Sequence, residues 1–264
     1  MPDTPDTVGG NDPPRHSMLH TLNGLLFAAS LFLVAGGLWL RDRLPPPASV
    51  LPASLSEPTQ VAERRAPFGV TRGGVDYTVS PLYAYELRGM VVSRHDTSVW
   101  WNPTHRNWWK DHLNVADLCI VWGENLKSGV YRELSYASGS FTCYVAAKDT
   151  QTWSQFDPTH LSNNHLLTAN PATAKLLRSV RPGDQVVVKG WLAEYAHDAG
   201  RPFRRGTSVR RDDTGNGACE TIWVEEVAVL ARANRGWRSA VPLGAIGAAL
   251  ALLLWCFLPA RLER

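Results

Sequence analysis

The composition of this 264-residue chain excludes several classes of protein before any motif is considered. Its net charge of +3 creates no strong overall field that would attract nucleic acid. With 44% hydrophobic and 19% charged residues, the chain is neither a disordered polymer nor a fibrous protein. Four cysteines in this length also exclude a small domain held together mainly by disulfide bonds.

Two apolar runs near the ends of the chain predict membrane-spanning helices. Residues 18–40 and 239–258 contain no Asp, Glu, Lys or Arg, and each run is long enough to cross a hydrocarbon core of about 30 Å. The first run is not typical of a cleaved signal peptide, because the preceding residues carry three Asp and a single Arg. Residues 1–17 are expected to form a disordered tail, and residues 259–264 a short C-terminal tail.

Two sequence signals disagree about the side of the membrane on which the central region lies. Residues 41–75 are rich in Pro, Ala and Ser, which predicts a semi-rigid linker of the kind that carries an extracytoplasmic domain. Five arginines, including those of the basic juxtamembrane segment 231–238, flank the spans on the central side, against three on the terminal side. This bias favours a cytoplasmic centre, but the rule weakens for loops beyond about 60 residues. We expect a multi-pass protein of the bacterial inner membrane with an extracytoplasmic central domain, and a cytoplasmic domain is the alternative.

Residues 76–230 are expected to form one mainly β domain, because they contain five apolar runs of strand length bounded by turn residues. A short helix is predicted between the third and fourth runs, where Asn170 can cap the helix and Pro171 occupies its first position. The five predicted strands are residues 85–93, 117–123, 140–147, 185–195 and 221–230.

Three strands, a helix and two further strands follow one another in the order of an OB fold, a five-stranded Greek-key barrel. The strand entry RPGDQVVVKGWL (181–192) resembles the fourth-strand entry of many OB-type domains. The segments SNNHL (162–166) and DDTGNGACETIWVEE (212–226) are similar to uncharacterised bacterial membrane-anchored proteins, a resemblance that implies no known chemistry. The predicted fold is an OB-like five-stranded barrel flanked by two transmembrane helices, with another small α+β domain or a β-sandwich as the alternative.

An aromatic motif, WWNPTHRNWW, occupies residues 100–109. Indole rings stack on sugars and on nucleobases, and each base contact contributes about 1–3 kcal/mol. The same rings can instead fill the core or lie on a membrane surface. The candidate ligand-binding residues of this motif are Trp100, Trp101, Trp108 and Trp109.

A basic loop over residues 201–220 supplies Arg205 and Arg210 as further candidate ligand-binding residues. Clustered guanidinium groups bind phosphate or carboxylate through paired hydrogen bonds. Alternatively, the arginines of this loop pair with Asp212 and Asp213 or stay solvated, and such exposed pairs contribute little to stability.

Two of the cysteines are candidates for a disulfide bond. Cys119 and Cys143 fall in consecutive predicted strands that are expected to be neighbours. A bond between them would close a loop of about 25 residues and stabilise the domain by about 3 kcal/mol in an oxidising compartment. Pairing of Cys219 with one of them is the alternative.

Cys219 is otherwise left without a disulfide partner in the domain, and it is a weak candidate for a catalytic thiol. With His165, and with Asn163 or Asn164, it provides the residue types of a thiol nucleophile and its base. The simpler interpretation is a small buried side chain, because free cysteines are often buried.

The sequence contains no H-E-x-x-H, C-x-x-C, P-loop, dinucleotide-binding or G-x-S-x-G motif, so neither a metal nor a cofactor is predicted. The leading hypothesis is a non-enzymatic binding or scaffold domain, which the bilayer anchors and which faces an envelope protein complex or a glycan. A thiol- or Arg-assisted hydrolase is one alternative. Binding of single-stranded nucleic acid by a cytoplasmic domain is another, which the near-neutral charge of residues 76–230 disfavours.

Overall fold

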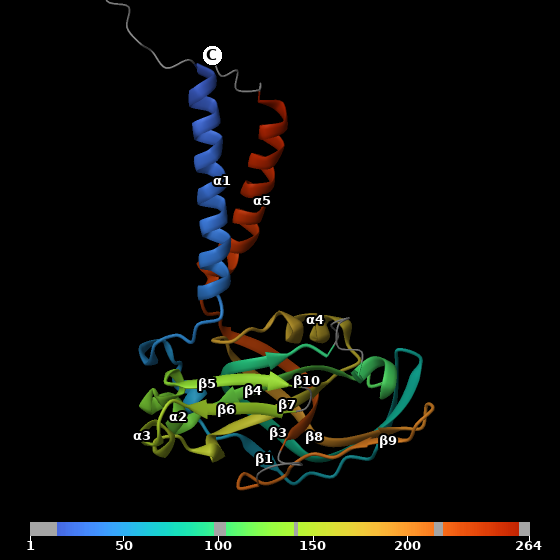
Figure 1. Ribbon diagram of the computed structural model, residues 1–264. Helices are drawn as coiled ribbons and strands as arrows, with labels where there is room; N and C mark the ends of the chain where they lie inside the picture. The colour runs from blue at the N-terminus through green and yellow to red at the C-terminus, as the bar shows by residue number, and fades with distance from the viewer. Residues whose placement is uncertain (1–14, 98–103, 140–141, 214–218, 259–264) are drawn as a thin grey trace, which may run out of the picture. The chain divides into compact units, whose positions relative to one another are not determined.

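A computed structural model describes residues 15–97, 104–139, 142–213 and 219–258 of the chain (Figure 1). Two compact units make up this structure. One is a β domain over residues 42–233, and the other is a pair of helices from the two terminal regions. The expected tails lie mostly outside the described residues, and the first helix begins at Arg15.

The β domain is built on five strands that pair in a closed ring. Four of the pairs are antiparallel, and β7 and β10 run parallel. The sheet closes on itself because β3 and β8 pair over most of the length of β8. In the order of their pairing, the ring strands are β3 (Val75–His95), β4 (Asn114–Val121), β7 (Leu161–Leu167), β10 (Glu220–Ala231) and β8 (Gln185–His197).

The inward-facing side chains of the ring strands form a shared apolar core. Val186 and Val188 of β8 lie in this core, as do Ile222 and Val224 of β10. β-branched residues suit such strands because they pack well on a pleated surface. Burial of each such side chain contributes about 1.5–3 kcal/mol, so this core is a major source of the stability of the domain. Side chains at the intervening positions face away from it.

Three short strands extend the sheet beyond the ring. β2 and the first part of β3 form a hairpin whose turn contains Gly73 and Gly74 at φ values of 61° and 74°. This left-handed region favours glycine because it has no Cβ. The added strands are β1 (Thr59–Val61) and β2 (Phe68–Arg72), which pair with β3, and β9 (Phe203–Arg205), which pairs with β8.

The predicted helix between the third and fourth ring strands is confirmed as α4 (Pro171–Ser179). Asn170 caps it, with Oδ1 accepting hydrogen bonds from the backbone N–H groups of Ala172 and Thr173 at 2.8 and 3.3 Å. Pro171 occupies the first turn, where no intrahelical N–H bond is lost. Ala174 and Leu177 of α4 pack into the core of the ring.

The prediction of the third ring strand is wrong. Residues 142–147 form β6 (Thr142–Ala147), which pairs with β5 (Leu134–Gly139) in a separate two-stranded sheet, and the third ring strand is β7. β7 is not recognisable as a strand in the sequence, because the polar run Ser162–His165 occupies its buried positions and breaks the apolar pattern. The insertion between β4 and β7 also contains α2 (Gly123–Ser128) and α3 (Thr150–Ser154).

A disulfide bond connects this insertion to the ring. It joins Cys119 of β4 to Cys143 of β6, the pair that the sequence singles out, with their Cα atoms 5.9 Å apart. Cys119 is fully buried and packs with Met90, Val121 and Tyr131 in a small apolar cluster between the ring and the insertion. The bond therefore holds the β5–β6 hairpin against the outer face of β4.

Much of the segment expected to be a semi-rigid linker, residues 41–75, packs on the β domain. Gln185 at the start of β8 accepts hydrogen bonds from Leu51 N at 2.7 Å and from Ser54 Oγ at 2.9 Å, and it donates to Ser49 O at 2.8 Å. The hydroxyl of Tyr131 donates to the carbonyl of Pro45 at 2.6 Å. The short 3-10 turns Pro47–Ser49 and Pro52–Leu55 belong to this segment.

The two terminal helices, α1 (Arg15–Leu40) and α5 (Arg235–Phe257), pack against each other (Figure 1). Both are long and apolar enough to cross a membrane by length and composition. Small residues allow their close approach, as a Cβ on Gly37 would lie 2.7 Å from Val241 Cγ2. Asn23 Nδ2 donates to the carbonyl of Ala251 at 3.0 Å, which links the helices by a buried hydrogen bond.

Loss of the disulfide should destabilise the β domain. Because Cys119 and Cys143 are separated by 24 positions, the Cys143→Ser substitution is expected to lower the free energy of unfolding by about 3 kcal/mol. Urea unfolding of the detergent-solubilised protein measures this change. The Cys256→Ser variant, which alters a free cysteine, is the control. Equal midpoints for Cys143→Ser and for the unreduced wild type would contradict a stabilising bond.

Candidate functional site

Cys219, His165 and Asp117 come together on the outer face of the ring. Asp117 lies opposite His165 in the β4–β7 pair, and residues opposite each other share one face of a sheet. His165 Nδ1 is 2.7 Å from Asp117 Oδ1. The side chain of Cys219 interacts with the imidazole of His165 closely enough to raise its pKa. The three groups therefore form a continuous chain from a thiol to a buried carboxylate.

Backbone contacts hold Cys219 immediately before β10. Its carbonyl accepts a hydrogen bond from Ser208 N at 2.9 Å, and the following residue enters the parallel pair with β7. Its sulfur accepts a hydrogen bond from Asn163 Nδ2 at 3.5 Å. Cys219 is half-buried, whereas His165 and Asp117 are 3% and 0% exposed. Of the three residues, Cys219 is therefore the least buried.

Charge and burial together fix the protonation of the buried pair. Burial by itself lowers the pKa of His165, but the charge of Asp117 and the hydrogen bonds to Asp117 and Cys219 raise it to about 9. Burial would raise the pKa of Asp117, yet the charge and hydrogen bond of His165 hold it at about 2. At neutral pH the pair is an imidazolium and a carboxylate, and the imidazolium contacts the thiol.

Asn114 supports the carboxylate of this pair from the start of β4. Its Nδ2 donates to Asp117 Oδ1 at 2.7 Å, the same oxygen that contacts His165. Asn114 is itself anchored, because its carbonyl accepts a hydrogen bond from Thr97 Oγ1 at 2.7 Å. A buried carboxylate needs such partners, since its loss of hydration costs several kcal/mol.

A second buried polar layer adjoins the Cys219–His165–Asp117 chain. The hydroxyl of Tyr195 donates to Asp111 Oδ2 at 2.6 Å, and His105 Nδ1 lies 3.7 Å from the same oxygen. Burial raises the pKa of Asp111, but the nearby imidazole of His105, the hydrogen bond from Tyr195 and the charge of Arg205 lower it overall. Arg205, a predicted ligand-binding residue, is therefore close enough to the buried Asp111 for its charge to act on this carboxylate. Its charge also lowers the pKa of His165.

The other predicted arginine does not join this site. Arg210 is exposed and makes two hydrogen bonds to Asp212, at 2.9 and 2.8 Å. Its neighbour Arg211 pairs with Glu220 at 2.7 Å. The Arg210–Asp212 pair matches the alternative in which the loop arginines pair with Asp212 and Asp213, whereas Arg211 pairs with Glu220, which that alternative did not name.

The tryptophan motif is only partly described by the structure. Trp100 and Trp101 lie outside the described residues. Trp108 is 73% exposed, and Trp109 is half-buried with its ring 5.9 Å from that of His105. The carbonyl of Trp109 is 2.7 Å from His197 Nε2. Trp109 therefore packs beside the second polar layer, while Trp108 is open to solvent.

Glu220 faces away from the thiol, on the side of the ring that encloses the core. It is 2% exposed, and burial raises its pKa to about 7 although the charge of Arg211 opposes this change. Cys219 and Glu220 are consecutive but belong to two separate polar groups, because successive side chains alternate across a strand.

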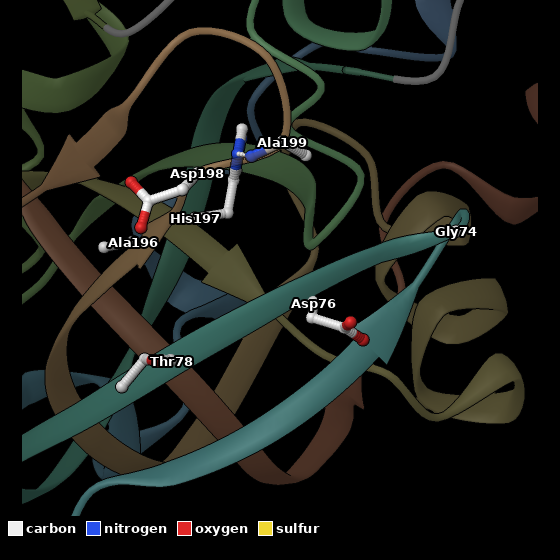
Figure 2. A pocket seen from close by; sticks show the side chains of 7 residues that line it. All are labelled: Gly74, Asp76, Thr78, Ala196, His197, Asp198 and Ala199. Atoms are coloured by element: carbon white, nitrogen blue, oxygen red, sulfur yellow. Dashed lines mark hydrogen bonds between the residues drawn. The ribbon is translucent and has the colours of Figure 1, made fainter.

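A shallow hollow of about 370 Å³ lies elsewhere, between the turn that precedes β3 and the end of β8 (Figure 2). Its polar side chains are those of Asp76, Thr78, His197 and Asp198. Both ring nitrogens of His197 are engaged, at 2.7 Å from Trp109 O and 3.1 Å from Ala199 N. Cys219 does not line this hollow, so it is not the site of the thiol.

Sequence reasoning names Cys219, His165 and either Asn163 or Asn164, but it misses Asp117 and Asn114. Asp117 is the first residue of a predicted apolar strand, where an acid normally marks the strand end. One signal was available: Asp117 and Cys119 alternate with core residues in β4, so they must share its outer face. The partner of that face, β7, was not recognised as a strand.

Comparison with protein-family models, curated proteins and solved structures finds no match for this chain. Among the described residues, no group of three or more His, Cys, Asp or Glu side chains is arranged to hold a metal ion. The functional interpretation therefore depends on the geometry around Cys219.

The buried pair should make stability fall at alkaline pH. Because the folded pKa of His165 is about 9, above the ordinary 6.5, its contribution is full below pH 6.5 and is lost as the pH rises through 9. The loss is on the order of 3 kcal/mol. Urea midpoints at pH 6 and pH 9.5 measure it, and His165→Gln should show a smaller decrease. An equal decrease in both proteins would show that His165 does not titrate in this way.

Proposed function

We propose that this protein is a membrane-anchored enzyme that uses Cys219 as its nucleophile, either a hydrolase or an acyl transferase. The observation that carries the proposal is the contact of Cys219 with an imidazolium that a buried carboxylate orients. A nucleophile, a base and an orienting acid in hydrogen-bond contact are the general signature of covalent catalysis. We favour this hypothesis over a purely non-enzymatic scaffold, because the fold brings three residues from separate parts of the chain together in one place.

In the proposed reaction, Cys219 attacks as the thiolate, the nucleophilic form of cysteine, beside the protonated imidazole of His165. Its sulfur attacks a substrate carbonyl carbon, and the carbonyl π electrons move to oxygen. Collapse of this intermediate breaks the bond to the leaving group, which takes the proton from His165. Asp117 keeps the imidazole oriented and stabilises its charge throughout. Water or a second acceptor then releases the acyl group with His165 as base.

We also propose that the β domain is of the OB type. The closed ring, the helix between its third and fourth strands, and the parallel pairing of the third and fifth strands support this assignment. In such domains, ligands bind on the face of strands 2 and 3. These strands are β4 and β7 here, and they carry Asp117 and His165.

The proposed location is the bacterial inner membrane, with two spans and the β domain on the extracytoplasmic side. The disulfide between Cys119 and Cys143 supports this side, because such bonds persist in oxidising compartments. The arginine distribution favours the opposite side, but the loop is too long for that rule to apply well. Envelope proteins, glycans and acylated envelope molecules would then be the available partners and substrates.

The reactivity of Cys219 should depend on His165. An ordinary thiol is only a few per cent ionised at pH 7. We therefore expect iodoacetamide to alkylate Cys219 about tenfold faster in the parent protein than in His165→Gln or Asp117→Asn. The parent is the full chain carrying Cys256→Ser, and mass spectrometry of the Cys219 peptide gives the rate.

His160→Gln is a matched control, since His160 also pairs with carboxylates, Glu57 at 2.7 Å and Asp157 at 2.8 Å. It should leave the alkylation rate unchanged. An alkylation rate for the parent equal to that of His165→Gln would count decisively against a Cys219 nucleophile.

Reporter fusions test the proposed topology. Alkaline phosphatase fused after Leu230 should be active, whereas the same enzyme fused after Arg264 should be inactive, because two spans return the chain to the cytoplasm. A fluorescent protein fused after Arg264 should fluoresce. The reverse pattern would place the β domain in the cytoplasm and favour intracellular substrates.

A further inference from the structure

We infer that Asn163 is a catalytic residue of the Cys219 site, whose side-chain amide stabilises the oxyanion that forms when the thiolate attacks a carbonyl. This inference rests on the proposed function and adds a specific role for one residue. It also restricts the substrate to carbonyl compounds such as esters, thioesters or amides. Alkyl transfer and disulfide exchange form no oxyanion, so they would gain nothing from this amide.

The geometry around the sulfur supports this role. Asn163 Nδ2 is 3.5 Å from Cys219 Sγ and donates a hydrogen bond to it. His165 contacts the same sulfur from two positions further along β7. The thiol is therefore approached by a proton carrier and by a fixed amide donor from one strand.

Asn163 is held in place before any substrate arrives. It lies in the third ring strand, β7, opposite Cys119 of β4, and it is 5% exposed. A donor on a strand between two paired neighbours moves little, which is the requirement for electrostatic stabilisation of a developing charge. Its Oδ1 has no hydrogen-bond partner among the described residues. The oxygen end of this amide is therefore not part of a structural hydrogen-bond network.

The change in charge during the reaction explains how one donor can serve two states. Before attack, the negative charge is on sulfur, and Nδ2–H stabilises it. When the sulfur–carbon bond forms, that charge passes to the carbonyl oxygen, which is attached to the carbon bonded to Sγ. The hydrogen bond of Asn163 is then free to follow the charge to oxygen. When the oxyanion collapses, the charge leaves with the departing group, which His165 protonates.

The neighbouring Asn164 illustrates why a single asparagine is assigned. Its side chain faces the opposite side of β7, where Nδ2 donates to Leu118 O at 3.1 Å and Ser162 Oγ at 2.9 Å. Asn164 is fully buried, against an exposed fraction of 5% for Asn163, and its amide donates to these oxygens instead of to the sulfur. It provides a matched substitution of the same residue type in the same strand.

Two reagents distinguish stabilisation of the oxyanion from the reactivity of the sulfur itself. Iodoacetamide alkylates Cys219 by displacement of iodide, which forms no oxyanion. The ester p-nitrophenyl acetate acylates the same sulfur through an oxyanion and releases p-nitrophenolate. Both rates are measured on the detergent-solubilised full chain carrying Cys256→Ser, with Cys219→Ser as the blank. Thermal unfolding verifies that each variant is folded.

Asn163→Ala should lower the acylation rate by about 100-fold, the usual effect of removing one oxyanion donor. The same substitution should change the alkylation rate by less than about threefold, because the imidazolium of His165 remains. Asn164→Ala should leave the ratio of the two rates at the parent value, even if it lowers the unfolding temperature.

A parallel decrease of both rates in Asn163→Ala, or an unchanged acylation rate, would overturn the oxyanion role while leaving the Cys219 nucleophile standing. A parent protein whose Cys219 is alkylated no faster than that of His165→Gln would overturn the proposed function itself. If Asn163→Ala does not fold, Asn163→Ser, which has a smaller polar side chain, replaces it, and the same ratio of rates decides.

Discussion

The pairing of β3 with β8 is the constraint on which both the core and the candidate site depend. This pairing closes the sheet, in which β7 pairs with β4 on one side and with β10 on the other. A shift of one residue in the register of any of these strands would exchange its inner and outer side chains. The burial of Leu118, Leu166 and Ile222 inside the ring therefore also directs Asp117 and His165 outward. The strand register that buries the apolar core therefore also places the polar side chains of the site.

The ion pair of Asp117 and His165 is a costly feature of the outer face. Both side chains are nearly inaccessible to water, and loss of hydration opposes their ionisation. Replacing such a pair with apolar residues is often neutral or stabilising. The exposed contacts of His160 with Glu57 and Asp157, by contrast, carry little cost. A pair this costly, placed beside the half-buried Cys219, supports the proposed activation of the thiol more than a role in stability.

Sequence patterns predicted the parts of the fold that depend on local signals. Strands rich in β-branched residues, such as β8, and the helix capped by Asn170 are set by alternation and capping, which are visible along the chain. β7 was not predicted as a strand, because its outer positions carry the polar residues Asn163 and His165, and its inner positions include Asn164. The contact of Cys219 with His165 could not be derived, since it depends on a parallel pairing between strands separated by α4 and β8. Long-range register of this kind leaves no local pattern.

At the start of β10, strand pairing positions the side chain of Cys219, the proposed nucleophile. Cys219 contacts Asn163 and His165 on the outer face, while Glu220 is held by Arg211 on the inner face. Because the two residues are consecutive, each set of contacts restricts the backbone that the other needs. On the same outer face, the disulfide at Cys119 fixes the β5–β6 hairpin to β4, beside the strand that carries Asn163. In the proposed reaction, paired strands would therefore order the sulfur, the imidazole of His165 and the amide of Asn163, with little reorganisation left for the attack on a carbonyl.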